Sequence, residues 1–186
     1  MKERLIKSKE RVKKFAEVFT PTWLADDMIE LVGDEVSKIK TRVLEPAVGE
    51  GVFLIQILKR KVANAKTIDD MFILLGSLYG VDIQLDNVQI TREKIFELWK
   101  GFFIQVTEEN PNADEIRAAK TIIEKNIIQG DMLSGLDANQ KQLHFSFWEQ
   151  YELGIISEVI FPLDGIVNNR SFPSWIHMFE RWEDIQ

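Results

Sequence analysis

The sequence predicts an α/β domain built on a parallel β-sheet. Three short apolar segments, each with a carboxylate at or near its end, alternate with segments of helical periodicity: residues 43–45, 78–82 and 126–133. Strands that alternate with helices form parallel sheets with right-handed crossovers. We therefore expect three acids, Glu45, Asp82 and Asp131, to lie along the one sheet edge where open α/β folds bind ligands.

Composition limits the class of protein. The 186 residues are 45% hydrophobic and include 12 Phe, which is enough for a real core. Without Cys the chain has no disulfides and no thiolate metal site, and its two His show no metal-binding spacing. No apolar run is long enough to cross a bilayer, and the charged N-terminus has no apolar signal core. We expect a cytoplasmic protein without membrane contact.

Charge is unevenly distributed along the chain. Residues 1–14 carry seven basic and two acidic side chains, a net charge of +5, so the rest must carry −12 to give the total of −7. We treat residues 1–17 as a basic N-terminal helix or arm and residues 18–186 as a single domain. Such an arm could contact nucleic-acid phosphates, or it could be a solvated helix or frayed terminus.

The first predicted elements are two helices. Residues 3–18 contain neither Gly nor Pro, which favours a helix. Thr20 before Pro21 is typical of a helix start, with Thr20 as the N-cap, and it predicts a second helix over residues 21–32. The side expected to face the core is apolar: Trp23, Leu24, Met28, Leu31 and Val32.

A glycine turn joins the first strand to the next helix. Gly49 and Gly51 allow positive φ and let a ligand approach the main chain, and a helix is predicted from about Gly51 to Ala65. Glu45 at the end of the strand would repel phosphate and accept hydrogen bonds from hydroxyl or ammonium groups. The alternative is a plain strand-to-helix turn without a ligand.

The remaining elements follow from periodicity and caps. Helices are predicted over residues 68–75 with Gly76 as C-cap, over 86–99, and from an Asp114 cap to about 125. Residues 143–148 and 155–161 favour an antiparallel hairpin, and residues 171–186 a short helix. Asp82 has two interpretations: an acceptor for ribose hydroxyls, or a cap for the helix beginning near Leu85.

Four segments, taken together, resemble one family. Residues 45–53 resemble the S-adenosylmethionine-binding motif Asp-Pro-Ala-x-Gly-x-Gly-x-Phe of the amino-group, adenine-N6 DNA methyltransferases, with Glu45 in place of Asp. Residues 18–21, 80–83 and 130–133 are similar to three further motifs of that family, in the same order. The resemblance covers residues 18–133 and implies a Rossmann-like S-adenosylmethionine-dependent methyltransferase fold, here with a truncated sheet and a C-terminal β-hairpin.

The resemblance also implies a cofactor site. The segment lining the methionine end would be Phe19, Thr20 and Pro21, and the turn would supply Glu45, Ala47, Gly49, Gly51 and Phe53. Asp82 would hold the ribose hydroxyls, Ile83 would lie against the adenine ring, and Asp131 with Met132 would contact the adenine amino group.

The catalytic residues are not identified by the sequence. The family presents its target amine to Asn/Asp-Pro-Pro-Tyr/Phe, and this tetrapeptide does not occur in the 186 residues. Two partial matches exist: residues 110–111 precede the last matching motif, and residues 168–173 lack the proline pair.

The sequence therefore predicts an S-adenosylmethionine-dependent DNA methyltransferase, adenine-N6 type, of a restriction-modification or phage system. The alternative is a catalytically incomplete cofactor-binding subunit that acts in assembly or regulation with a partner chain. The expected partners are DNA and either a partner subunit or a second copy of the chain. An NAD site is disfavoured, because the third glycine of its motif would fall at Leu54 and Asp82 lies 31 positions after Gly51.

Overall fold

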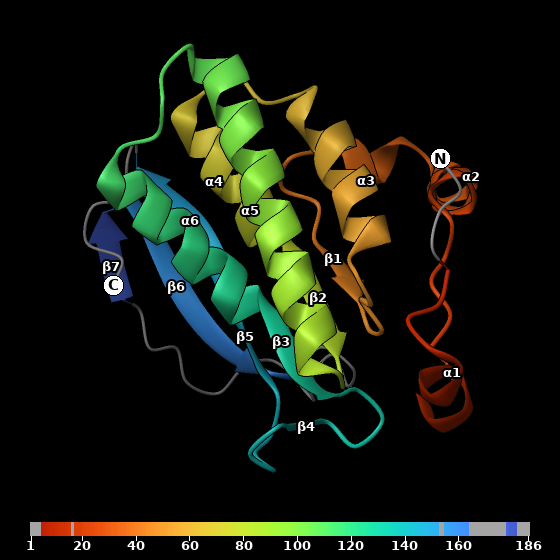
Figure 1. Ribbon diagram of the computed structural model, residues 1–186. Coiled ribbons are helices and arrows are strands. Elements are labelled where there is room, and N and C mark those ends of the chain that lie inside the picture. The colour runs from red at the N-terminus through yellow and green to blue at the C-terminus, as the bar shows by residue number, and fades with distance from the viewer. Residues whose placement is uncertain (1–4, 16, 153–154, 164–177, 182–186) are drawn as a thin grey trace.

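The computed structural model describes residues 5–15, 17–152, 155–163 and 178–181, and it is a mixed α/β structure with two sheets (Figure 1). In the first sheet, strands β1 (Val43–Glu45), β2 (Leu78–Asp82) and β3 (Ile127–Asp131) are parallel in that order, and β4 (Leu136–Asp137) pairs antiparallel with β3. The second sheet is antiparallel and consists of β5 (His144–Glu152), β6 (Ile155–Pro162) and β7 (Met178–Arg181). This arrangement is compatible with a Rossmann-like fold.

Four helices cover one face of the parallel sheet: α3 (Val52–Val62), α4 (Ile68–Gly76), α5 (Leu85–Thr107) and α6 (Ala113–Asn126) (Figure 1). Their shared core is built around Trp99, which is fully buried, contacts the rings of Phe72 and Phe103, and donates from Nε1 to the Met71 carbonyl at 2.9 Å. The crossover helices between β1, β2 and β3 thus bury their apolar faces against the sheet.

The β5–β6 hairpin covers the opposite face of β2. Residues of β2 alternate between the two faces, as expected for a strand. Gly80 lies against Val48 and Leu54 on the helix side, while Tyr79 lies against the rings of Phe145 and Phe161 of the hairpin. The parallel strands and the antiparallel hairpin predicted from the sequence are both confirmed.

The N-terminal helices differ from prediction. Helix α1 (Lys9–Phe15) is only 7 residues long, and α2 (Thr22–Val32) has Pro21 as its N-cap without a side-chain hydrogen bond. The predicted cap by Thr20 was therefore wrong. The predicted core face of α2 was also wrong: its buried residues are Ala25 and Ile29. The apolar residues assigned to the core are all exposed: Trp23, Leu24, Met28, Leu31 and Val32.

Several helix boundaries also need correction. Helix α3 begins at Val52, and a short 3-10 helix (Asp34–Ser37) separates α2 from β1. Gly76 is the last residue of α4 and not its C-cap; a Cβ there would lie 2.9 Å from Trp148, so close packing explains this glycine. Helix α5 extends to Thr107, and α6 is capped by Asn112, whose capping box with Glu115 replaces the predicted Asp114 cap.

The C-terminal region holds a strand where a helix was predicted. Residues 178–181 form β7, which pairs antiparallel with β6 as the third strand of the hairpin sheet. The partial catalytic match at residues 168–173 lies outside the described residues. Within the described part of the chain, no helix is both long enough and apolar enough to span a membrane.

Candidate functional site

The glycine turn after β1 is tied to the end of β2. Gly49 and Gly51 have φ of 54° and 85°, a region that favours glycine. The Gly49 N–H donates to Asp82 Oδ2 at 2.8 Å, and the Val48 N–H donates to the Val81 carbonyl at 2.8 Å. The turn is therefore held against the carboxyl end of the sheet.

Helix α5 holds the other side of this turn through Thr91. The Thr91 hydroxyl donates to the Gly49 carbonyl at 2.9 Å. A Cβ on Gly51 would lie 2.8 Å from Thr91 Cγ2, a distance that a real Cβ does not reach. Both its positive φ and the close approach of α5 therefore require glycine at position 51. The sequence predicted only a ligand role for this glycine.

A cavity of about 420 Å³ lies beside the turn. Five of the twelve residues predicted to bind cofactor line it: Phe19, Thr20, Ala47, Gly49 and Phe53. A Cβ on Gly49 would come within 3.5 Å of the Phe19 ring, which shows how closely the segment before α2 approaches the turn. The volume is within the range of small-molecule sites. The other seven predicted residues do not line this cavity.

The three acids lie at one edge of the sheet, but each is displaced along the strand direction from the one before. Glu45 is level with Gly80, and Asp82 is level with Gln129. Asp82 therefore lies two residues beyond Glu45, and Asp131 two residues beyond Asp82, a step of about 7 Å each time at the usual strand rise. Of the three acids, Asp82 is the one that accepts from the Gly49 N–H, and Glu45 accepts from the Ala47 N–H.

The Asp82 carboxylate accepts three hydrogen bonds. Oδ2 accepts from Gly49 N–H, while Oδ1 accepts from the Gln84 N–H at 2.8 Å and from Asn87 Nδ2 at 3.2 Å. The N-cap of α5 is Gln84, without a side-chain cap hydrogen bond, so Asp82 is not the helix cap of the alternative interpretation; it bonds the N–H of the cap residue instead. It does so while also fixing the glycine turn.

Glu45 and Asp131 have different electrostatic surroundings. Glu45 is half-buried, and this burial raises the pKa of its carboxyl above the usual value. It accepts a long hydrogen bond from the Ala47 N–H at 3.3 Å. Asp131 accepts from the Leu133 N–H at 2.9 Å, which lowers its pKa. Glu45 is thus the carboxylate that gains most from a hydroxyl or ammonium donor.

Ile83 and Met132 are separated from the cavity. Ile83 is 57% exposed at the end of β2, and its carbonyl accepts from Gln129 Nε2. Met132 packs against the cluster formed by the hairpin and Tyr79. Pro21 serves as the N-cap of α2. None of these three residues lines the cavity, although Pro21 directly follows Thr20, which does.

Several residues at the site had no signal in the sequence. Asn87 and Thr91 on α5 are buried and bond to Asp82 and Gly49, and Lys7 and Arg11 of the basic arm reach the start of the same helix. Sequence periodicity does not predict these contacts, since the partner of each residue lies more than three positions away in the chain. Both basic residues form ion pairs with acids of the same chain.

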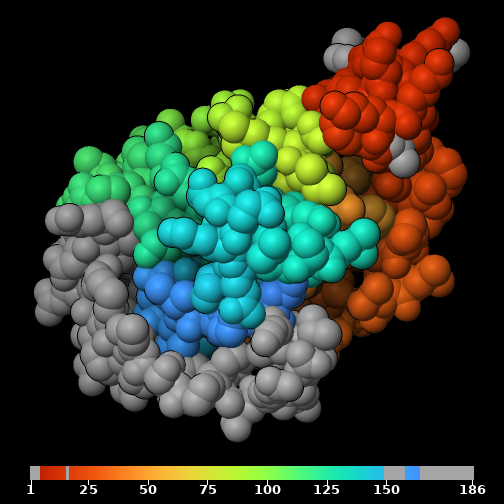
Figure 2. All heavy atoms as spheres, turned by 90° about the horizontal axis from the view of Figure 1, so that it is seen from below, coloured from red at the N-terminus to blue at the C-terminus, as the bar shows by residue number. Residues whose placement is uncertain are grey.

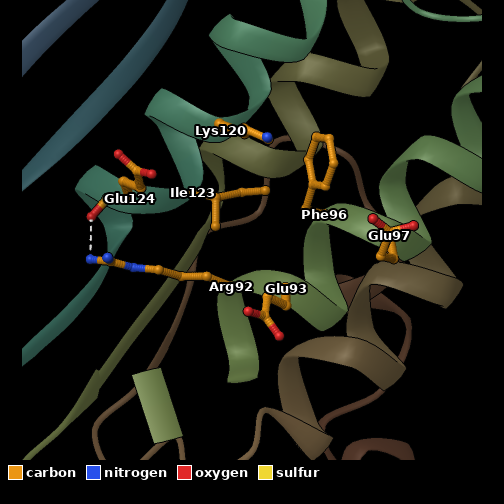
Figure 3. Close-up of a pocket in the computed structure, with 7 residues that line it drawn as sticks. All are labelled: Arg92, Glu93, Phe96, Glu97, Lys120, Ile123 and Glu124. Carbon is orange, nitrogen blue, oxygen red and sulfur yellow. Dashed lines mark hydrogen bonds between the residues drawn. The ribbon is translucent and has the colours of Figure 1, made fainter. Parts of the chain in front are cut away.

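A second cavity, of about 300 Å³, lies between α5 and α6 (Figure 3). Arg92 lines this cavity, and its guanidinium donates to the carbonyls of Glu124 and Ile127 at the C-terminal end of α6. Lys120 lies 5.0 Å from the centre of the Phe96 ring. These groups are used by the fold, and we do not assign this groove a ligand.

The chain is similar to one curated protein. It is 34% identical over 130 residues to a protein of Methanocaldococcus jannaschii named "putative type II restriction enzyme and methyltransferase". The match covers 61% of this chain and 10% of the relative, so the chain spans about a tenth of the length of the protein it matches. No family model matches the chain, and no solved structure matches it significantly.

Proposed function

We propose that the carboxyl edge of the parallel sheet binds S-adenosylmethionine and that the chain is the cofactor-binding part of a DNA methyltransferase of a restriction-modification or phage system. The observation that carries the proposal is the bond between the Gly49 N–H and Asp82, beside a cavity that is lined by Gly49, Phe19 and Thr20. The name of the relative, which joins restriction enzyme and methyltransferase, supports the same class.

The residues present fit an adenosyl cofactor. Among the described residues, Asp82 Oδ2 accepts one hydrogen bond and so has room for one more, which a ribose hydroxyl would fill. A second hydroxyl would have to replace one of the donors that the carboxylate now has. The half-buried Glu45 would accept from a hydroxyl or ammonium group, and the bound group would supply the methyl for transfer.

The adenine-N6 specificity of the proposal rests on the motif resemblance. Residues 110–111, one partial match to the catalytic tetrapeptide, lie beyond the C-terminal end of α5. A helix of 23 residues is about 35 Å long, so this loop is far from the glycine turn at the other end of α5. The catalytic group must therefore come from another part of the chain or from a partner.

DNA contacts by the arm would use its exposed lysines. Lys7 and Arg11 form ion pairs with acids of the domain, whereas Lys9, Lys13 and Lys14 are exposed. Binding through these three would weaken as salt increases. We include DNA as a partner on this basis and on the function named for the relative.

A second function is favoured by the hairpin. In this chain β5 and β6 occupy the second face of the parallel sheet, after the last matching motif, where the sequence holds no Asn-Pro-Pro-Tyr. The alternative proposal is therefore a catalytically incomplete cofactor-binding subunit that acts with a partner chain or with a second copy.

Transfer of a labelled methyl group from S-adenosylmethionine to unmodified DNA separates the two proposals. The purified chain is assayed alone and with the products of neighbouring genes, and Asp82→Ala is compared with Asp27→Ala, which removes the same charge from the exposed side of α2. Activity of the lone chain, lost in Asp82→Ala only, supports the enzyme. Activity that requires a partner supports the subunit, and cofactor binding without any transfer in either mixture contradicts the enzyme.

A further inference from the structure

Ion pairs of Lys7 and Arg11 with Asp86 hold the basic arm against the start of α5, and we call these pairs the clasp. Figure 2 shows the arm, in red, against the yellow-green first turns of that helix. Lys7 Nζ lies 2.9 Å from Asp86 and 3.6 Å from Glu50. The Arg11 guanidinium lies between two carboxylates, with bonds of 2.6 Å to Glu17 and of 2.9 and 3.1 Å to Asp86. The two cations are mainly buried, with 13% and 23% of their side chains exposed.

Asn87 connects this clasp to the ligand site. It is 1% exposed, and its amide orientation is fixed by its partners: an ammonium can only donate, so Oδ1 faces Lys7 at 2.5 Å. Carboxylates can only accept, so Nδ2 donates to Glu17 at 2.8 Å and to Asp82 at 3.2 Å. One side chain therefore bonds the arm on two sides and the ligand-site acid on a third.

The arm also forms part of the cavity wall. Leu5 lines the same cavity as Gly49, and its carbonyl accepts from the Phe19 N–H at 2.7 Å. A continuous series of hydrogen bonds runs from Arg11 through Glu17, Asn87 and Asp82 to the Gly49 N–H. Release of the arm would open the wall and remove two partners of Asn87, Lys7 and Glu17.

We propose that Lys7, Arg11 and Asn87 are positioning residues of the cofactor site, which hold the Asp82 carboxylate and the Gly49 turn in the shape that binds S-adenosylmethionine. This inference rests on the proposed function for its ligand but not for its structural part. Asp86, the acid that pairs with both cations, is half-exposed, so salt should screen these ion pairs and cofactor affinity should fall. The Arg11 pairing lowers the pKa of Glu17, and Lys7 lowers that of Asp86, so both acids are charged at neutral pH.

The structural part is tested by hydrogen exchange without ligand. Arg11→Ala and Asn87→Asp should each speed exchange of the amides of residues 47–51 by about tenfold, while the amides of α4 exchange as in the unchanged protein. Lys13→Ala is the matched control, since it removes a positive charge from the exposed side of the same helix α1. Unchanged exchange of the turn in both variants would overturn the proposal. Arg11→Ala lies outside the core, so it keeps the test valid even if Asn87→Asp unfolds.

The functional part is tested by affinity for S-adenosylmethionine at low and high salt. The unchanged protein should lose about tenfold affinity between about 0.05 and 0.5 M salt, whereas Arg11→Ala should bind weakly and lose much less. Equal salt dependence in both proteins would overturn the positioning role. If the unchanged protein does not bind the cofactor at all, the proposed function fails, and the exchange result still decides whether the clasp fixes the turn.

Discussion

The main-chain N–H of Gly49 and the carboxylate of Asp82 are joined by a hydrogen bond of 2.8 Å, which connects the turn after β1 to the end of β2. The two residues are 33 positions apart in the chain. Since the same carboxylate also accepts from Gln84 and Asn87, a change at this acid acts on the turn and on the first residues of α5 together.

Asp82→Ala should weaken S-adenosylmethionine binding by roughly 1.5 to 3 kcal/mol, the usual contribution of hydrogen bonds to a charged group. Calorimetric titration measures the loss, and Asp27→Ala, which changes an exposed acid on α2, should bind as the unchanged protein does. An affinity that Asp82→Ala leaves intact would mean that the cofactor does not use the end of β2.

Gly51→Ala should lower the free energy of unfolding more than Gly135→Ala. Both glycines have positive φ, 85° and 72°, but a Cβ at Gly51 would meet Thr91 at 2.8 Å, whereas the nearest atom to a Cβ at Gly135 is Leu163 Cδ2 at 3.7 Å, an ordinary contact. Strain at positive φ should cost each about 1 kcal/mol, and the clash should add about 1 to 3 kcal/mol at Gly51. Urea denaturation measures both, and equal losses would argue against the close contact with α5.

The orientation of α2 can be tested with one pair of variants. Ile29 is 4% exposed and Leu31 is 89% exposed. Ile29→Ala should cost about 2 to 5 kcal/mol of unfolding free energy, and Leu31→Ala less than about 0.5 kcal/mol. The reverse ranking would restore the core face that the sequence pattern predicts.

Lys61 gives a pH dependence with a defined sign. It is fully buried, its ammonium donates to the carbonyls of Lys38, Ile39 and Thr41, and burial lowers its pKa from 10.5 to about 8. Between these two pH values the unfolded chain binds more protons, so the stability of the folded protein rises with pH.

The measurement for Lys61 compares the unchanged protein with Lys61→Met, which cannot titrate. Their difference in unfolding free energy should shift in favour of the unchanged protein by about 1 to 3 kcal/mol between about pH 8 and pH 10. A difference that stays constant over this interval would place the pKa of Lys61 near that of an exposed lysine.

The sequence predicts local features well. The strand at residues 78–82 and the helix that begins at Ile68 match the structure, because an apolar run and a capping box are encoded by neighbouring residues. The buried face of α2 was predicted wrongly, since its large apolar residues are exposed and only Ala25 and Ile29 are buried. Periodicity shows that a helix is amphipathic, but not what covers it.

The site is predictable to a similar degree. Gly49 and Asp82 each belong to a motif that the sequence shows, and in the structure they are joined by a hydrogen bond. Asn87, Lys7 and Arg11 belong to no motif, because their roles depend on partners up to 80 residues away that only the folded chain brings together. The basic arm was interpreted from its charge alone, and the structure shows that part of this charge is neutralised within the domain.

The most direct test of the account is calorimetric titration of S-adenosylmethionine into protein stripped of ligand. We expect saturable heat at one cofactor per chain, reduced in Asp82→Ala and in Gly49→Val, in which a side chain would stand against the Phe19 ring. No heat at millimolar cofactor would contradict the assignment of the glycine turn and the Asp82 carboxylate as a cofactor site.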